Sequence, residues 1–168
     1  MFRRLAEAQA MVEFALALPI LLLVLYGLIE VGRVIFIYST VITASREAVR
    51  YGSAYGVNGV SATSVPVYED CAGIRNAAKK VGFLLNLQDS NIVISYDQGL
   101  DASGIPINWQ EGCPPAFSVA SGDRINVAVT YDYSPILTFV PLTSKTVSSS
   151  ASRTIMGDID LSVTESPH

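Results

Sequence analysis

Residues 7–33, EAQAMVEFALALPILLLVLYGLIEVGR, form an apolar stretch that contains the carboxylate Glu13 and the proline Pro19. No charged residue occurs between positions 14 and 29, and the apolar trend extends over 11–37. About 20 to 25 helical residues are enough to cross a hydrocarbon core of about 30 Å. The stretch therefore predicts a membrane-spanning helix.

The composition is that of one membrane anchor joined to one domain. Hydrophobic residues make up 50% of the 168 residues and charged residues 15%, and the mean hydropathy is +0.39. This balance is too apolar for an ordinary soluble protein and too polar for a protein with several spans. The net charge of −4 includes no basic run of the kind that follows a phosphate backbone, so nucleic acid is not an expected partner.

The basic residues Arg3 and Arg4 precede the apolar stretch, which predicts an N-terminus in the cytoplasm and an extracytoplasmic chain after Tyr38. The alternative is a cleaved secretory signal peptide, which shares this basic-then-apolar order. We rank it lower because no small-residue cleavage site ends the run. Instead a helical apolar stripe continues through Val34, Ile37, Val41, Ala44, Ala48, Tyr51 and Tyr55.

A carboxylate and a proline are both costly inside such a helix. A charged side chain at the bilayer centre costs about 2.5 to 3.5 kcal/mol on insertion scales, and less near the interface. A proline removes one helical hydrogen bond, although membrane helices tolerate this defect more easily than helices in water. Glu13 therefore either lies at headgroup level or has a partner.

The order of a short basic leader, a small residue, a glutamate and an apolar run with a proline resembles the N-terminus of type IV pilin-like subunits. It is most similar to the TadE-like pseudopilins of tight-adherence pili. The segments QAMVEFALALPILLLVLYGLIEVGR and TASREAVRYG resemble the opening block of that family. RINVAVTYDYSPILTFVPLTSKTVSSSASRTIM is similar to its C-terminal strand, turn and final strand.

The resemblance implies that a prepilin peptidase cuts between Ala8 and Gln9, so that Glu13 becomes the fifth residue of the mature chain. The ammonium group at Gln9 of one subunit would then pair with Glu13 of its neighbour, and Pro19 would loosen the helix where subunits crowd. The expected segments are a leader at 1–8, a transmembrane and assembly helix at 9–38, an extracytoplasmic pilin-like domain at 39–156 and a flexible tail at 157–168.

Two acid-base pairs are expected along the same helix. Glu30 and Arg33 are three residues apart, as are Glu47 and Arg50, so each pair shares one helix face. Solvated or interfacial ion pairs are the simple interpretation. Because GLIEVGR lies in the block that resembles the family, a docking role for Glu30 and Arg33 in assembly is a second hypothesis.

The rest of the chain predicts an α+β fold, with a second helix at 67–86 and a small antiparallel sheet. The second helix has an apolar stripe through Cys71, Ile74, Ala78, Val81 and Leu85. Strands are expected at 91–96, 124–133 and 145–155 because of their β-branched or alternating patterns. The last is poor in large apolar groups, which favours an edge position.

Residues 97–122 are too long and too rich in glycine and proline for a plain hairpin. The two cysteines, Cys71 and Cys113, lie beyond the membrane, where oxidation permits a disulfide that tethers this loop; two free buried thiols are the alternative. Such a bond would stabilise the fold by about 4 kcal/mol on the chain-entropy model. We expect Trp109 to pack beneath the loop, and the acidic spacing predicts no metal site.

Two further segments bear on function. The oily segment 134–142, SPILTFVPL, is expected either to fold onto the helices as core or to expose a patch that meets another subunit. The single histidine is His168, which leaves no histidine-based triad, and no cofactor motif is present.

The sequence therefore predicts a non-enzymatic, single-pass pilin-like subunit. Its expected partners are the membrane, prepilin peptidase, other pilin-like subunits and the pilus assembly machinery, in a homo- or hetero-oligomeric filament. The alternative is an uncleaved membrane anchor whose extracytoplasmic domain binds a ligand or an envelope component.

Overall fold

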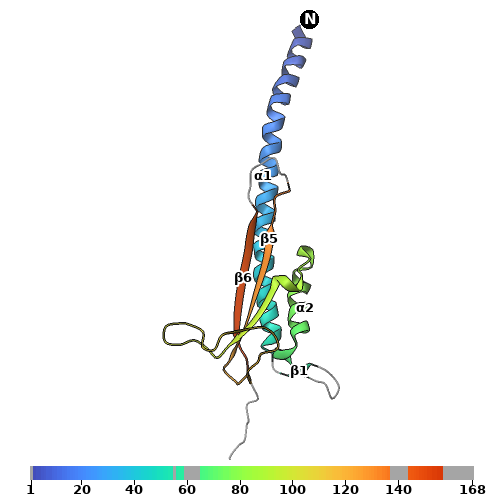
Figure 1. Ribbon diagram of the computed structural model, residues 1–168. Helices are drawn as coiled ribbons and strands as arrows, with labels where there is room; N and C mark the ends of the chain where they lie inside the picture. The colour runs from blue at the N-terminus through green and yellow to red at the C-terminus, as the bar shows by residue number, and fades with distance from the viewer. Residues whose placement is uncertain (1, 55, 59–64, 137–143, 157–168) are drawn as a thin grey trace, which may run out of the picture.

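The computed structural model describes residues 2–54, 56–58, 65–136 and 144–156. Helix α1, Phe2–Gly52, is a single long rod (Figure 1). Its N-terminal half extends away from the rest of the protein, and its C-terminal half packs against the sheet and the second helix. The predicted tail at 157–168 lies outside the described residues.

Helix α2, Cys71–Val81, is shorter than the predicted helix at 67–86. The Asp70 side chain caps its start by accepting a hydrogen bond of 2.9 Å from the Gly73 amide. The flanking residues form 3-10 turns, η1 at Val67–Glu69 and η2 at Phe83–Leu85, and Asn86 then adopts a left-handed conformation. The apolar stripe is confirmed, with Ile74, Ala78 and Leu85 buried and Cys71 and Val81 partly buried.

The main sheet is antiparallel and has the strand order β4-β3-β5-β6. Its strands are β3, Ile92–Asp97; β4, Gln110–Glu111; β5, Arg124–Tyr133; and β6, Lys145–Thr154. The three predicted strands and the α+β fold class are thus confirmed, whereas β4 was not predicted. A separate two-stranded ladder pairs β1, Val57–Asn58, with β2, Val65–Pro66, and residues 59–64 between them are not described.

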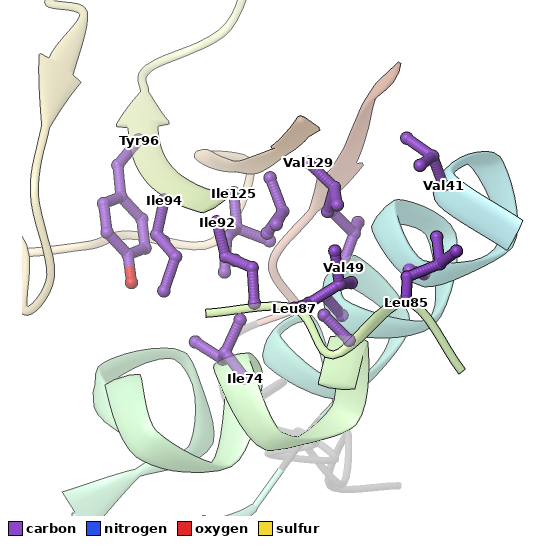
Figure 2. Packing of buried hydrophobic residues seen from close by; sticks show 14 of the residues in the cluster. Val41, Val49, Ile74, Leu85, Leu87, Ile92, Ile94, Tyr96, Ile125 and Val129 are labelled. Carbon is purple, nitrogen blue, oxygen red and sulfur yellow. The ribbon is translucent and has the colours of Figure 1, made fainter. Parts of the chain in front are cut away.

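The hydrophobic core lies between α1, α2 and one face of the sheet (Figure 2). Alternate residues of β5 point to this face and pair with inward residues of β3, as in Val127 with Ile94 and Ile125 with Tyr96. The core members from the helices and the sheet are Ile37, Val41, Ala44, Ala48, Val49, Ile74, Ala78, Ile92, Ile94, Tyr96, Ile125, Val127, Val129 and Tyr133. The end of α1 is equally tight, since a Cβ on Gly52 would lie 2.5 Å from Ile125 Cδ1.

Strand β6 is an edge strand, as predicted. It pairs with β5 along its whole length, and no strand in the described ranges pairs with its other side. Its small residues let it approach α1 closely, and the buried Ser45 Oγ lies 3.2 Å from Ser149 Oγ. The same small side chains that make β6 hard to predict as a strand allow it to pack closely against α1.

The segment 97–122 is more ordered than the sequence predicts. Residues 98–109 form a hairpin that we call the finger, which projects sideways from the sheet (Figure 1). Asp101 Oδ1 accepts hydrogen bonds of 2.8 Å from the amides of Ser103 and Ile105 and so fixes its tip. The prediction that Trp109 packs beneath the loop is wrong, because 53% of its surface is exposed on the finger.

A buried carboxylate holds the base of the finger to the sheet. Asp97 at the end of β3 accepts hydrogen bonds from Arg124 Nε at 2.8 Å, Arg124 Nη2 at 3.0 Å, Asn126 Nδ2 at 2.6 Å and the Gly99 amide at 2.9 Å. Asn126 Oδ1 in turn accepts a hydrogen bond from the Ser152 hydroxyl. This network joins β3, β5 and β6 on the face of the sheet opposite α1.

Candidate anchoring and assembly site

The N-terminal half of α1 exposes apolar side chains on every side. Among the described residues, α1 is the one helix long and apolar enough to cross a membrane, and no part of its most apolar window is buried in the protein. A helix that is apolar all round and has no protein cover requires an apolar solvent or other helices. The exposed side chains include Met11, Val12, Phe14, Leu16, Ile20, Leu21, Leu22, Leu23, Val24, Leu25, Leu28 and Ile29.

The three residues singled out near the start of α1 lie in continuous helix. Glu13 is exposed, and its Oε1 accepts a hydrogen bond of 3.1 Å from Gln9 Nε2 one turn earlier. The predicted cleavage between Ala8 and Gln9 therefore falls within α1, and it remains a prediction. Pro19 is also inside the helix, which continues on both sides of it.

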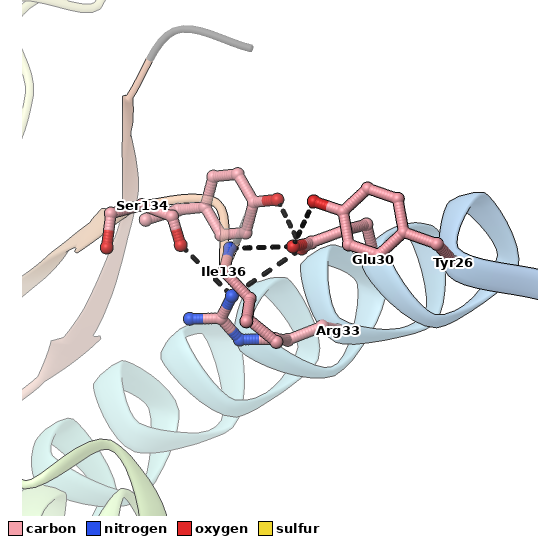
Figure 3. A network of polar contacts seen from close by, with 6 residues as sticks. Tyr26, Glu30, Arg33, Ser134 and Ile136 are labelled. Carbon is pink, nitrogen blue, oxygen red and sulfur yellow. Dashed lines mark hydrogen bonds and ion pairs between the residues drawn. The ribbon is translucent and has the colours of Figure 1, made fainter. Parts of the chain in front are cut away.

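Glu30 lies where the exposed half of α1 meets the folded domain, and only 4% of its surface is exposed. Its Oε1 accepts hydrogen bonds from Tyr26 Oη at 2.8 Å and from the Ile136 amide at 2.7 Å, while its Oε2 accepts one from Tyr133 Oη at 2.6 Å (Figure 3). The carboxylate is thus hydrogen-bonded within the chain, and two of its three donors, the Tyr133 hydroxyl and the Ile136 amide, lie more than 100 residues away in the sequence.

Arg33 completes this group of contacts. Its Nη1 lies 3.5 Å from Glu30 Oε2 and donates a hydrogen bond of 3.0 Å to the Ser134 carbonyl, and its guanidinium carbon lies 5.3 Å from the centre of the Tyr133 ring (Figure 3). The predicted pair of Glu30 and Arg33 is confirmed. Of the two simple interpretations, a solvated or an interfacial pair, full solvation is wrong, because only 31% of the Arg33 side chain and 5% of the Glu30 side chain is exposed.

We call the set Tyr26, Glu30, Arg33, Tyr133, Ser134 and Ile136 the clamp. It fastens the start of the predicted oily segment to α1, while residues 137–143 of that segment are not described. The sequence contained one indication of it, since a carboxylate at the end of an apolar run requires a partner. The sequence did not show which residues these partners are, because Tyr133 and Ile136 are more than 100 residues away along the chain.

Replacing Glu30 by alanine is expected to release the end of β5 from α1. Hydrogen bonds to a charged group contribute about 1.5 to 3 kcal/mol each, and tenfold in an equilibrium corresponds to about 1.4 kcal/mol. The Ile136 amide should therefore exchange with deuterium about 10 to 100 times faster in Glu30→Ala, measured by mass spectrometry on the full chain in detergent micelles. Glu47→Ala removes a carboxylate that pairs with Arg50 on α1 itself and should leave this exchange unchanged. Equal exchange rates in wild type and Glu30→Ala would contradict the role of the clamp.

The predicted disulfide between Cys71 and Cys113 is present, with an S–S distance of 2.12 Å and a Cα–Cα distance of 5.7 Å. It joins the first residue of α2 to the segment that follows β4. The Tyr96 hydroxyl donates a hydrogen bond of 2.5 Å to the Tyr68 carbonyl beside this bond, and burial raises the pKa of Tyr96 above its usual value. The disulfide thus tethers the segment after β4 to the start of α2.

Within the described ranges, no group of three or more histidine, cysteine, aspartate or glutamate side chains is placed to hold a metal ion. The two polar clusters described above, at Glu30 and at Asp97, have their donors and acceptors matched within the chain. The exposed apolar helix and the clamp are the two features on which the proposed function is built.

The family model described as TadE-like protein matches residues 8–50. This match confirms the predicted resemblance over that segment, which comprises Gln9, Glu13, Pro19, Glu30 and Arg33. No curated protein and no solved structure matches the chain. The matched segment and the exposed apolar helix together fit a membrane-anchored protein associated with a pilus.

Proposed function

We propose that this chain is a minor pilin-like subunit of a tight-adherence pilus, inserted by α1 and processed by prepilin peptidase. The observation that carries the proposal is that the TadE-like match covers the helix whose N-terminal half has no protein cover. Such a helix can exchange lipid for the helices of other subunits, because both surroundings are apolar. The domain would then remain extracytoplasmic, and α1 would enter the bundle of helices in the pilus or at its base.

The clamp supports this role mechanically. Glu30 and Arg33 tie β5 to α1 beside the exposed half of the helix, so that force on the helix is transmitted directly to the sheet. A docking function for the same two residues would require them to leave partners that they already have within the chain. We therefore assign Glu30 and Arg33 to holding the domain on the helix, and Glu13 to contact between subunits.

Processing is tested by the N-terminus of the native protein. We expect the chain purified from its own cells to begin at Gln9, as measured by N-terminal sequencing and intact mass. Ala8→Arg, which places a long charged side chain at the cut, should retain residues 1–8. A wild-type chain that still begins at Met1 in cells with assembled pili would refute processing.

A second function is favoured by the finger. Leu100, Ile105, Ile107 and Trp109 are exposed on it, although they are apolar. An uncleaved membrane anchor that presents this finger to a ligand or an envelope component would also explain the exposed helix. The same N-terminal measurement separates the two, since this function needs no loss of residues 1–8.

A further inference from the structure

We propose that the domain rests on the membrane surface, with the Ile136 side chain inserted among the lipids at the level of Glu30. This inference rests on the proposed insertion of α1. It adds a second contact with the bilayer, made by a residue that is distant from α1 in the sequence. The partner is the boundary between lipid headgroups and acyl chains.

The position of Glu30 along α1 sets the level. Glu13 and Glu30 bound the 16 uncharged residues from 14 to 29, which rise about 24 Å as helix. A hydrocarbon core is about 30 Å thick, so two carboxylates at this separation fall near its two faces. Glu30 is therefore placed at the outer edge of the hydrocarbon, where its buried hydrogen bonds replace lost hydration.

The clamp brings Ile136 to that same level. The Ile136 amide is 2.7 Å from Glu30 Oε1, and yet 59% of the residue's surface is exposed. On α1, Ile29, Val31, Ile35 and Phe36 are also exposed within six residues of Glu30, so exposed apolar side chains occur near this level both on the helix and on the segment after β5. Arg33 and the tyrosines Tyr26 and Tyr133 provide the polar and aromatic groups that are typical of a membrane interface.

A second exposed apolar site on the domain lies too far from this level. Leu84 is 63% exposed, and its neighbour Leu85 belongs to the same core cluster as Val41 of α1 (Figure 2). Val41 is eleven residues beyond Glu30, which is about 16 Å along the helix axis. The headgroup region adds only about 5 to 8 Å on each side of the hydrocarbon core. Leu84 therefore stays in water and provides a matched control.

The test measures the depth of three single positions in the full chain. Leu22→Cys, Ile136→Cys and Leu84→Cys are each labelled with an environment-sensitive fluorophore under non-reducing conditions, which keep Cys71 and Cys113 bonded. The chains are reconstituted in phosphatidylcholine and phosphatidylglycerol vesicles that carry nitroxide lipids, with the nitroxide either near the headgroup or near the bilayer centre. Hydrogen exchange of β5 confirms that each variant is folded.

We expect the nitroxide near the bilayer centre to quench the label at position 22 most strongly. The nitroxide near the headgroup should quench the label at position 136 most strongly. The label at position 84 should be quenched by neither. If position 22 is quenched but position 136 is not, α1 is inserted and the surface contact is refuted. If position 22 escapes both nitroxides, the insertion of α1 fails, and the contact that rests on it fails as well. Equal quenching at 84 and 136 would show general apolar adhesion and would also overturn the proposal.

Discussion

Glu13→Ala is expected to abolish incorporation of the subunit into pili while leaving its insertion into the membrane intact. The Glu13 side chain is exposed at the start of the uncharged stretch 14–29 of α1, and within the described part of the chain it accepts a hydrogen bond from the uncharged side chain of Gln9. In an assembled bundle this carboxylate would be removed from water. Its charge then requires a cation, and the ammonium group freed at Gln9 of a neighbouring subunit is the one that processing supplies.

The size of the effect follows from the cost of an unpaired charge. Opposite unit charges at 4 Å attract by about 4 kcal/mol at an effective dielectric constant of 20, against about 1 kcal/mol in water. Loss of Glu13 leaves the neighbouring ammonium without this partner at every interface of this kind, so assembly fails although each subunit is folded. The apolar residues that drive insertion are unchanged, and removing one carboxylate makes insertion more favourable.

Glu13→Gln separates charge from shape. Glutamine has nearly the same size and still accepts a hydrogen bond, but it cannot neutralise an ammonium group, so it should fail to assemble as alanine does. Glu47→Ala, on the same helix but beside α2, should assemble normally. The measurements are the fraction of subunit in sheared pili and in membranes, by immunoblot. Normal incorporation of Glu13→Gln would disprove pairing by charge.

The elements of the fold that have a local signal could be predicted from the sequence. The apolar period predicted α1 and the buried stripe of α2, and the alternation from Ile125 to Tyr133 predicted β5. The disulfide could be predicted because the chain has only two cysteines and both were expected beyond the membrane, where oxidation permits such a bond. The scarcity of large apolar residues in 145–155 indicated an edge strand, since edge strands are less apolar than central ones.

The features that depend on distant partners could not be predicted. The glycines and prolines of 97–122 argued against a plain hairpin, but the finger within it also needs Asp97 to be held by Arg124, which lies on another strand. Trp109 was expected beneath the loop, whereas the finger carries it outward, with 53% of its surface exposed. Only the fold reveals that Ile136 returns to Glu30.

Asp97→Ala is expected to lower the free energy of unfolding of the domain by about 3 to 5 kcal/mol, the usual cost of breaking a buried ion pair from one side. The Asp97 side chain is fully buried and has four donors at 2.6 to 3.0 Å. Without it, Arg124 becomes a poorly solvated cation and the donors on Asn126 and Gly99 lose their acceptor. The measurement is urea unfolding of the full chain in detergent micelles, followed by the near-ultraviolet circular dichroism of the buried tyrosines.

Asp89→Ala is the matched control. Asp89 Oδ1 lies 2.8 Å from Lys79 Nζ, the same distance as that from Asp97 Oδ1 to Arg124 Nε, but the pair is largely exposed to solvent. Exposed pairs contribute less than about 1 kcal/mol, so this variant should be nearly as stable as the wild type. If the two variants lost the same free energy, burial of the Asp97 network would not be the source of its contribution.

The same network predicts how stability depends on pH. Burial alone would raise the pKa of Asp97, but the hydrogen bonds from Arg124, Asn126 and Gly99 outweigh it, so the pKa lies below its usual value. The ionised form is therefore favoured in the folded state, and its stabilisation is fully present above the unfolded pKa of about 3.9 and is lost as the pH falls through the folded pKa. Wild type should lose stability below about pH 4 more steeply than Asp97→Ala, because alanine has no proton to take up. Parallel curves for the two proteins would show that Asp97 is not the titrating group.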